Sequence, residues 1–168
     1  MLMAGLLFTL GCGGEKAAGG AGGDQAAAAP AAAEAPAAAD VAGNPEGERV
    51  YGTVCVTCHQ ADGNGLPGAF PPLAGSAVAT GDAVVPIKIV LHGLTGQLTV
   101  NGDTFNGMMT PWGSTLSDAE VAAVLTYVRS NFGNSAEAVT EAQVAEVRAA
   151  TSGQTAPFTT TDLGIAGE

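Results

Sequence analysis

Two cysteines and a histidine stand together in the pentapeptide "CVTCH", which runs from Cys55 to His59. On one helical turn, two thiols three positions apart can each add to a vinyl group on the same edge of a porphyrin. The imidazole that follows then lies beneath the ring, where it can ligate iron. Cys-x-x-Cys-His is the attachment pattern of haem c. The motif therefore predicts one covalently bound haem c, with Cys55 and Cys58 as thioether positions and His59 as an axial ligand.

Two other kinds of site use closely spaced cysteines, and the surroundings of the motif favour neither. A thioredoxin-like redox pair needs a strand before the motif and a helix after it, whereas here a helical pattern precedes and a Gly/Pro loop follows. A zinc site needs further cysteine or histidine ligands nearby, and only His92 remains.

Iron bound by one histidine has a second axial position, and the candidates for it are Met108, Met109 and His92. The two methionines lie in "NGMMTPWG", which is expected to be a Gly/Pro-containing loop. A thioether is a soft ligand that can hold ferrous iron. Because the two methionines show no helical or strand period, ordinary core filling is the weaker interpretation. His92 is expected to end a helix and to serve there as a structural or surface residue.

The elements that must position these groups are helices joined by glycine- and proline-rich loops. Asn44 and Pro45 form a helix start, and apolar residues at helical spacing lead from there into the motif. Residues 60–76 are dense in glycine and proline and are expected to be loop. A short helix is predicted over residues 83–92, with its true start at Pro86.

A small hairpin and the clearest helix of the chain come next. Asn101-Gly102 lies between short β-prone runs and predicts a tight turn. Ser117 and Glu120 form a capping box, and Gly133 lies just past the end of the helix that it opens. The apolar face of this helix consists of Val121, Val124, Leu125 and Val128.

A second capping box, Thr140 with Gln143, opens an alanine-rich helix that is predicted to reach about Ala150. The polar tail from Ser152 is expected to be loose. Residues 135–168 are therefore predicted to form a C-terminal helix and a loose tail that follow the main domain.

The 168-residue chain carries a formal net charge of −11, with 5 basic and 16 acidic residues. Without a basic patch to neutralise phosphates, it is not expected to bind nucleic acid. Aromatic residues make up only 5% of the chain, so a bound cofactor is expected to supply apolar bulk to the core. The acidity favours partners that are basic or indifferent to charge.

Residues 1–12 form a short apolar run that ends at Gly11-Cys12. The run is too short to span a bilayer, which takes about 20 residues, but it suits the apolar core of a secretion signal. A small residue directly before a cysteine resembles the bacterial lipoprotein signal, which makes Cys12 a candidate for lipidation. Cleavage to a soluble secreted form and a buried cysteine are the alternatives. Residues 13–45 are rich in Ala, Gly and Pro and are predicted to be a flexible tether.

Four blocks of the sequence make the chain resemble class I cytochromes c, and among them bacterial monohaem cytochromes. The resemblance covers residues 46–134 and implies a cytochrome c domain of all-α class: a few helices around one covalent haem, with Gly/Pro-rich loops and a small hairpin. The four blocks are "CxxCHQADGxGxPGxFPPLAGS" at 55–76, "LHGLTG" at 91–96, "VNGxxFNGxM" at 100–109 and "LSDxEVAAVLTYVRSNFGN" at 116–134.

The resemblance also implies roles for single residues. Met109 rather than Met108 matches the methionine ligand of the family, although Met109-Thr110-Pro111 stands where Met-Pro-Pro is usual. Pro71 matches the proline whose carbonyl accepts the hydrogen bond of the proximal histidine. Trp112 is placed beside the haem edge, where its indole N–H meets a propionate or simply packs. Gly47 and Tyr51 match the N-terminal helix positions that cross the C-terminal helix at Val124 and Tyr127.

These features predict a protein that transfers electrons and is not an enzyme. The first hypothesis is a carrier on the extracytoplasmic, periplasmic side, anchored to the membrane by lipid. Its donor would be a quinol-oxidising complex or a dehydrogenase, and its acceptor a terminal oxidase or reductase. The second hypothesis is a fixed electron-transfer subunit of a dehydrogenase, oxidase or reductase. A haem enzyme or gas sensor is a third, and it requires an exchangeable sixth ligand.

Overall fold

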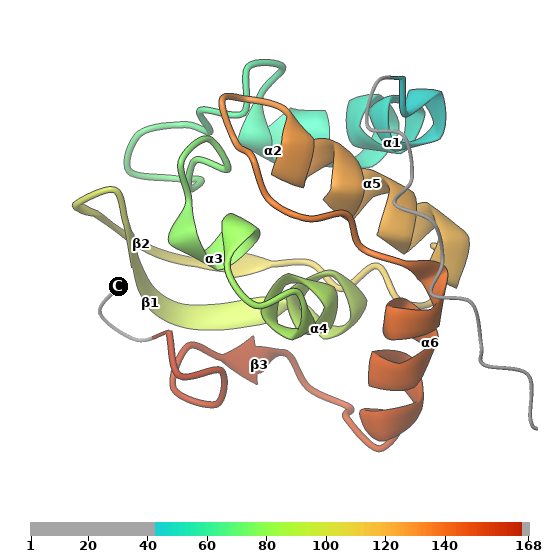
Figure 1. Cartoon of the computed structure of the whole chain (residues 1–168). Helices are drawn as coiled ribbons and strands as arrows, with labels where there is room; N and C mark the ends of the chain where they lie inside the picture. Colours follow the sequence, from blue (N-terminus) through green and yellow to red (C-terminus); the bar gives the residue numbers. More distant parts are fainter. Residues whose placement is uncertain (1–42, 166–168) are drawn as a thin grey trace, which may run out of the picture. The chain divides into compact units, whose positions relative to one another are not determined.

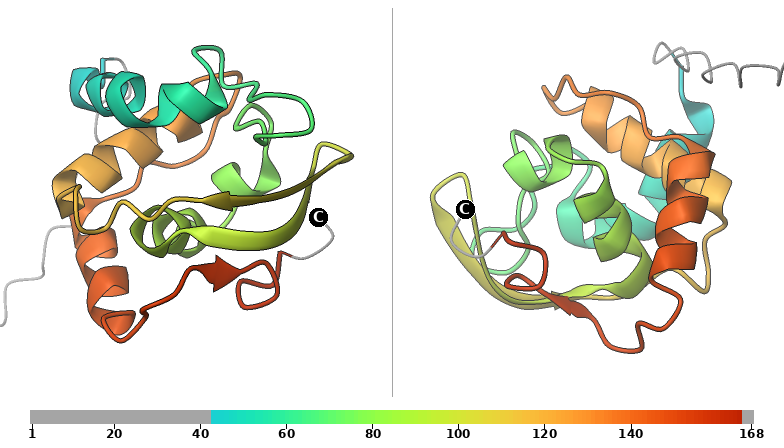
Figure 2. Two further views of the ribbon diagram at one scale, coloured as in Figure 1. Left: turned by 180° about the vertical axis from the view of Figure 1, so that it is seen from behind. Right: turned by 60° about the horizontal axis from the view of Figure 1, so that its bottom comes forward.

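The computed structural model describes residues 43–165. Their fold is mostly helical with one small sheet, and α1, α2 and α5 lie on one side of α3 and α4 with the sheet on the other (Figures 1 and 2). The predicted signal segment, Cys12 and the tether up to residue 42 lie outside the described residues. In chain order the elements are α1 (Pro45–Val50), the π-helical turn η1 (Tyr51–Cys55), α2 (Val56–His59), α3 (Ala77–Thr80), α4 (Val84–His92), β1 (Leu94–Val100), β2 (Asp103–Met109), α5 (Asp118–Ser130), α6 (Glu141–Ala150) and β3 (Phe158–Thr159).

Helix α1 begins as predicted and crosses α5 at a glycine. The Asn44 side chain accepts a hydrogen bond from the Gly47 N–H at 2.8 Å, and Pro45 fills the first helical position. The Asn44 amide also donates to the Ala123 carbonyl of α5 at 2.8 Å. A Cβ at Gly47 would lie 2.7 Å from Cβ of Tyr127 and would collide with the Ala123 carbonyl. Only glycine therefore permits this close approach of the two helices.

The helix that carries the motif continues from α1 through a widened turn. In η1 the N–H of Val56 bonds to the carbonyl of Tyr51, which is the spacing of a π-helix. Helix α2 then ends at His59, and the Tyr51 hydroxyl donates to the carbonyl of Gln60 at 2.7 Å. The buried Tyr51 thus fastens both ends of the segment that holds the motif.

Both predicted capping boxes are present at the starts of α5 and α6. The predicted apolar face of α5 is buried, and it forms one hydrophobic cluster with residues of α1, α4 and α6. Helix α4 begins at Val84, so the buried Pro86 lies within its first turn and does not mark its start. Among residues 43–165, no helix is long and apolar enough to cross a bilayer.

The three-stranded sheet has the order β2-β1-β3. Strands β1 and β2 form the predicted hairpin, in which Leu94 lies opposite Met109. Asn101 and Gly102 both have positive φ, as a two-residue hairpin turn requires. The hairpin is longer than the sequence predicted, because β2 continues to Met109. The expectation that the two methionines lie in a loop is therefore wrong: both are strand residues.

The segment after α6 is ordered by contacts that the sequence did not predict. Phe158 and Thr159 form β3, which pairs with β1 in parallel. Ile165 is only 5% exposed and joins a second hydrophobic cluster with residues of α4, β1 and β2. The expectation of a loose tail from Ser152 is thus wrong for residues 158–165. Their apolar residues are too sparse to form a pattern, and the order comes from the sheet that they cover.

Candidate functional site

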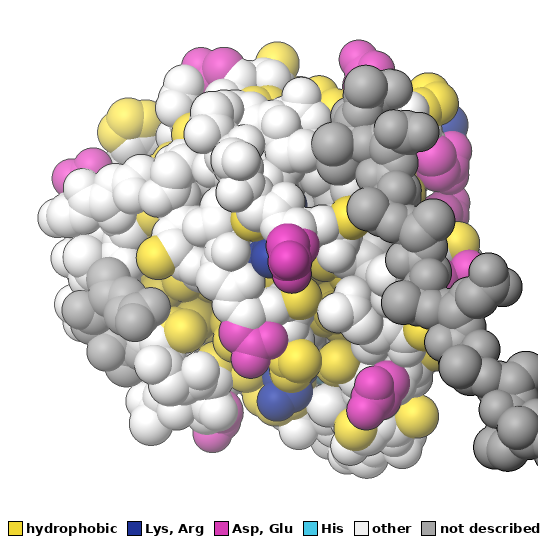
Figure 3. All heavy atoms as spheres, in the orientation of Figure 1, with side chains coloured by type: hydrophobic (Ala, Val, Ile, Leu, Met, Phe, Trp, Pro, Cys, Tyr) yellow, Lys and Arg dark blue, Asp and Glu magenta, His cyan; other side chains and the backbone are white. Residues whose placement is uncertain are grey.

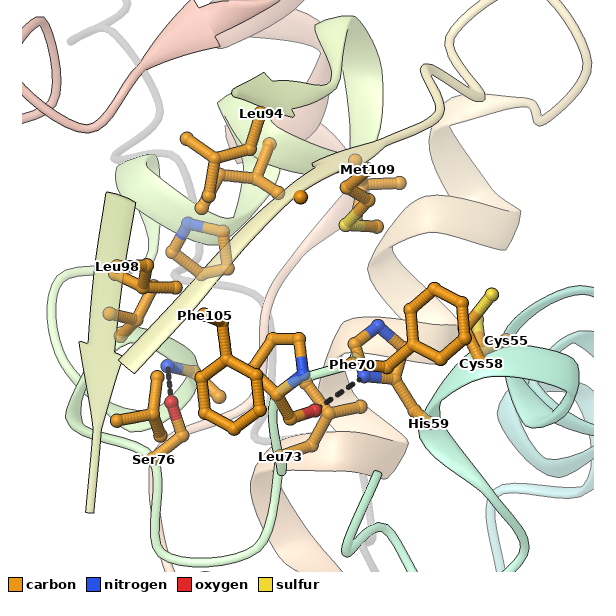
Figure 4. A pocket seen from close by; sticks show the side chains of 18 of the residues that line it. Cys55, Cys58, His59, Phe70, Leu73, Ser76, Leu94, Leu98, Phe105 and Met109 are labelled. Atoms are coloured by element: carbon orange, nitrogen blue, oxygen red, sulfur yellow. Dashed lines mark hydrogen bonds between the residues drawn. The ribbon is translucent and has the colours of Figure 1, made fainter. Parts of the chain in front are cut away.

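An apolar cavity lies between the motif helix, the sheet and α5 (Figure 4). Helices α3 and α4 and the loop around residues 69–73 complete its walls. The residues that line it include the described haem-site candidates from the sequence, apart from His92: they are Cys55, Cys58, His59, Pro71, Met108, Met109 and Trp112. The fold therefore gathers three separate stretches of the chain around one hollow.

Cys55 and Cys58 both face this cavity from the turn that joins η1 to α2. Both are free thiols and partly buried. Burial raises the pKa of Cys55 to about 11, and nearby Cys58 adds to the rise. A raised pKa disfavours the thiolate that disulfide exchange requires. Within residues 43–165, no three side chains of His, Cys, Asp or Glu are grouped as a metal site.

His59 is 8% exposed and is held by the loop that follows it. Its Nδ1 lies 3.0 Å from the carbonyl oxygen of Pro71, as the family resemblance implied. Because a carbonyl can only accept, Nδ1 carries the proton and Nε2 keeps its lone pair. Burial lowers the pKa of the ring, while the bond to Pro71 opposes that shift. A neutral imidazole with a free Nε2 is the form that ligates a metal.

A tight loop brings the Pro71 carbonyl to this position. Gly65 has φ +65°, and its N–H donates to the His59 carbonyl at 3.0 Å. A Cβ at Gly65 would lie 2.6 Å from the Pro71 oxygen and closer still to the carbonyl of Phe70. Leu66 and Phe70 exchange two backbone hydrogen bonds, at 2.9 and 2.8 Å, and so close the loop. The glycine is therefore required both for its conformation and for the close approach.

Strand alternation separates the two methionines. Met108 and Met109 are successive residues of β2, so their side chains leave opposite faces of the sheet. Met108 is 67% exposed, whereas Met109 is partly buried and packs against both hydrophobic clusters. Figure 4 shows Met109 across the cavity from His59. The geometry therefore favours Met109 over Met108 as the residue opposite the histidine.

Trp112 and His92 occupy different environments. Trp112 lines the cavity and is partly buried, and its backbone N–H bonds to the Val90 carbonyl at 2.8 Å. His92 ends α4, with its Nε2 2.7 Å from the Thr151 hydroxyl and its ring edge-on to Phe158. His92 is absent from the cavity lining, so it lies among structural contacts, in agreement with the prediction.

Two buried polar residues near the cavity were missed in the sequence. Ser76 lines the cavity and caps α3, and Arg129 is buried on α5 beside Val128, which also lines the cavity. The burial of Arg129 can be inferred from its position in the sequence. Arg129 follows Val121 and Leu125 at four-residue spacing and therefore lies on the same apolar face of the helix. A charged residue in a buried stripe indicates a specific internal partner.

Each lysine and arginine side chain among residues 43–165 contacts another group of the protein. Arg49 pairs with Glu46 and Glu120, and Arg148 pairs with Asp118. Arg129 donates to backbone carbonyls, and the ammonium of Lys88 lies 5.6 Å from the centre of the Phe158 ring. Figure 3 shows acidic side chains spread over the visible face, with few basic ones. The surface therefore presents mainly negative charge to a partner.

The chemistry of the lining fits haem c. Two thiols on one turn, an imidazole with a free Nε2 and a thioether across the cavity match what a covalent porphyrin iron requires. The apolar walls suit the porphyrin ring, since the chain has few aromatic residues of its own to fill such a hollow.

Comparison with known proteins agrees with this fit. The family described as cytochrome c matches residues 45–132. The chain is 40% identical over 93 residues to a cytochrome c-552 of Thermus thermophilus, an alignment that covers 53% of this chain and 70% of that protein. It covers 62% of a second cytochrome c-552 from the same species, at the same identity.

More distant similarity links the chain to subunits of dehydrogenases. It is 32% identical over 110 residues to the fructose dehydrogenase cytochrome subunit of Gluconobacter japonicus, covering 62% of this chain and 22% of that protein. It is 32% identical over 105 residues to the cytochrome c subunit of the quinone-dependent alcohol dehydrogenase of Komagataeibacter europaeus, covering 61% of this chain and 22% of that protein. The chain thus spans about a fifth of these subunits.

Proposed function

The chain belongs to the cytochrome c family of electron carriers and holds one covalent haem c through its Cys-x-x-Cys motif, and from this we propose that it is an extracytoplasmic, membrane-anchored carrier between respiratory complexes. Its donor would be a quinol-oxidising complex or a dehydrogenase, and its acceptor a terminal oxidase or reductase. The bound haem supplies a one-electron couple at iron.

The observation that carries this proposal is the pair of side chains on facing walls of the cavity. His59 offers Nε2 from one wall and Met109 offers its sulfur from the other. Two protein ligands would leave iron no open position for oxygen or peroxide, so electron transfer is the chemistry that such a site supports. A thioether ligand also favours the reduced state and raises the potential.

The remaining residues of the cavity would hold these ligands still. The Pro71 carbonyl fixes the orientation of the His59 ring and increases the basicity of Nε2. Pairing with Leu94 holds Met109 at the end of β2. Trp112 would donate its indole N–H to a haem propionate or pack against the ring edge. Little would rearrange when an electron arrives or leaves, which keeps transfer fast.

We infer that partners dock on an apolar rim formed by Leu66, Phe70 and Met108. These side chains are 48%, 36% and 67% exposed, and Phe70 and Met108 also line the cavity. Exposed apolar groups at a cavity mouth offer a short route for electrons to a partner pressed against them. Because the surrounding charge is acidic, a basic partner should react more slowly as ionic strength rises, whereas a neutral one should be little affected.

The ligand assignment is tested by replacing each methionine in turn. Met109→Ala should abolish the weak red absorption band of a methionine–ferric iron bond, lower the potential and allow the reduced protein to bind carbon monoxide. Met108→Ala is the matched control and should retain the band, since Met108 is a neighbouring residue of the same strand with an exposed side chain. Loss of the band in Met108→Ala alone would reverse the assignment.

The membrane anchor is tested at Cys12. Mass spectrometry of the mature protein should find a diacylglycerol-modified cysteine as its first residue, and Cys12→Ser should release the protein into the soluble fraction. An unmodified Cys12 in the native protein would overturn the anchor and leave the electron carrier intact.

A fixed subunit of a larger enzyme is the second candidate, and the similarity to dehydrogenase cytochrome subunits favours it. Helix α6 and the segment up to residue 165 would then be docking elements. Purification from native membranes separates the two candidates. Stoichiometric recovery with a catalytic subunit supports the fixed subunit, and recovery of the cytochrome alone supports the mobile carrier.

A further inference from the structure

A buried hydroxyl lies at the end of the cavity opposite the two cysteines. Figure 4 shows Ser76 on the far side of the cavity from Cys55 and Cys58. Ser76 is 3% exposed, and its Oγ accepts a hydrogen bond from the N–H of Ala79 at 3.3 Å. Among the described residues its hydroxyl hydrogen has no acceptor, so one buried donor at this end of the cavity is unused.

A buried cation bonds to the other end of α3, whose N-terminus Ser76 caps. Arg129 is 5% exposed, and its Nη1 donates to the carbonyls of Ala79 and Gly81 at 2.8 and 3.0 Å. Its Nε donates to the carbonyl of Glu137 at 2.7 Å. All three acceptors are neutral backbone groups, so the guanidinium bonds to no described carboxylate, although the charges of Glu137 and Asp82 act on it from nearby. Ala79 joins the two residues, because its N–H bonds to Ser76 and its carbonyl to Arg129.

The covalent attachment fixes which edge of a porphyrin reaches this end. Thioether bonds to Cys55 and Cys58 hold the vinyl edge of haem c, and the two propionates extend from the opposite edge. A carboxylate buried there needs a hydrogen-bond donor and a compensating positive charge. We propose that the Ser76 hydroxyl donates to a haem propionate at this end of the cavity, and that the Arg129 cation, which does not line the cavity, stabilises the propionate charge at longer range.

The two residues act in different ways under this proposal. Ser76 touches the propionate, so it lowers the proton affinity of that carboxylate. Arg129 acts at longer range through its charge, and it also ties α5 to the residues on either side of it. A positive charge near the haem favours the ferrous state, since oxidation adds a further positive charge to the site. Both effects depend on the covalent haem and not on Met109 being the sixth ligand.

The test for Ser76 is a redox titration of the holoprotein over a range of pH. In Ser76→Ala, the pH at which the midpoint potential changes should rise by about one unit, the effect of removing one charge-assisted hydrogen bond from a carboxylate. Ser135→Ala, at an exposed serine, is the matched control and should keep the profile of the original protein. Because Ser76 also caps α3, lost stability alone does not count as support. An unchanged profile in a folded Ser76→Ala protein would overturn the direct contact.

The test for Arg129 separates its charge from its hydrogen bonds. Arg129→Lys keeps the charge and loses the three-carbonyl geometry, whereas Arg129→Gln loses the charge. Both should be less stable, but only Arg129→Gln should lower the midpoint potential. The decrease should correspond to a several-fold change in the equilibrium constant for one-electron reduction, for which a tenfold change is about 59 mV. Equal potentials in the two variants would show a purely structural role and overturn the electrostatic one. The red band must persist in all variants, so that a change of axial ligand is recognised separately.

Discussion

The two walls of the cavity are built by different means. His59 ends a helix, and Pro71, its hydrogen-bond partner, lies 12 positions along the chain. Met109 is placed by strand pairing with Leu94, in a sheet whose third strand is Phe158–Thr159. The cysteines and the histidine of the histidine wall are thus fixed within five consecutive residues, whereas the position of Met109, on the methionine wall, depends on the register of the β1–β2 hairpin.

This difference makes the methionine wall the one that is sensitive to errors of pairing. A shift of one residue in β2 would exchange the faces of the sheet from which the Met108 and Met109 side chains extend. No comparable slip is available to the motif, because its thiols and imidazole are fixed within five consecutive residues. The hydrophobic cluster around β1, with Ile89, Phe105 and Ile165, therefore protects the register as well as the fold.

The largest effect is expected when the histidine wall loses its ligand. His59→Ala should nearly abolish accumulation of the holoprotein, because the iron loses its ligand on the side where the ring is attached. Met109→Ala should still accumulate with covalent haem. The yield of haem that stays bound in denatured protein measures both. Similar yields from the two variants would show that the walls contribute equally to maturation.

Ile165→Ala should weaken the methionine wall from outside the cavity. Ile165 is buried against the sheet, so its truncation should lower the free energy of unfolding by about 2–4 kcal/mol. Ile165→Val is the graded control and should cost about 1 kcal/mol. Denaturant unfolding gives both values, and the red band should be lost at lower denaturant concentration in Ile165→Ala. A change below that of the valine variant would contradict a packing role for this segment.

A pair of glycines in one loop tests how the histidine wall is held. Gly65 and Gly68 both have positive φ, so alanine at either position carries about 1–2 kcal/mol of backbone strain. At Gly65 the new Cβ would also collide with the carbonyls of Phe70 and Pro71, whereas nothing lies within 4 Å at Gly68.

Gly65→Ala should therefore be the more destabilising change, and only this variant should shift the NMR signal of the His59 Nδ1 proton in the holoprotein. Thermal unfolding compares the two. If Gly68→Ala were equally destabilising, the close approach at Gly65 would carry no extra cost.

The smallest effect is expected from pH, at the contact between α4 and α6. Burial lowers the pKa of His92 below its ordinary value near 6.5, and the charge of Arg148 lowers it further. Because the folded state resists protonation, His92 costs no stability above the unfolded pKa and destabilises the fold as pH falls below it.

His92→Gln, which keeps a side-chain donor near Thr151, should flatten the dependence of unfolding free energy on pH between about 7 and 5. An identical slope in the variant would show that other groups cause it. His59 bound to iron, as proposed, would not titrate in this range, so the two histidines are distinguished.

The features that the sequence predicts correctly have short-range signals. The motif, both capping boxes, the Asn101-Gly102 turn and the glycine crossing at Gly47 each depend on residues a few positions apart or on one conformational requirement. The Pro71 carbonyl was placed correctly through the family resemblance.

The failures concern contacts that only the tertiary fold creates. Gly107 before the two methionines and Thr110-Pro111 after them hide the alternation of β2, so the sequence predicts a loop where the strand lies. Phe158 and Ile165 are isolated apolar residues in a polar segment, and the sheet edge and apolar surface that order them come from β1. Arg129 has no visible partner in the sequence, since its partners are backbone carbonyls.

The engagement of every described cation has a consequence for how identical copies of this protein meet. Two such molecules approach each other with carboxylates on both surfaces, and within a Debye length of about 8–10 Å they repel. Electron self-exchange between like molecules is thereby slowed, while encounter with a positively charged acceptor is accelerated. The charge distribution thus favours electron transfer to a different, positively charged protein over exchange between identical copies.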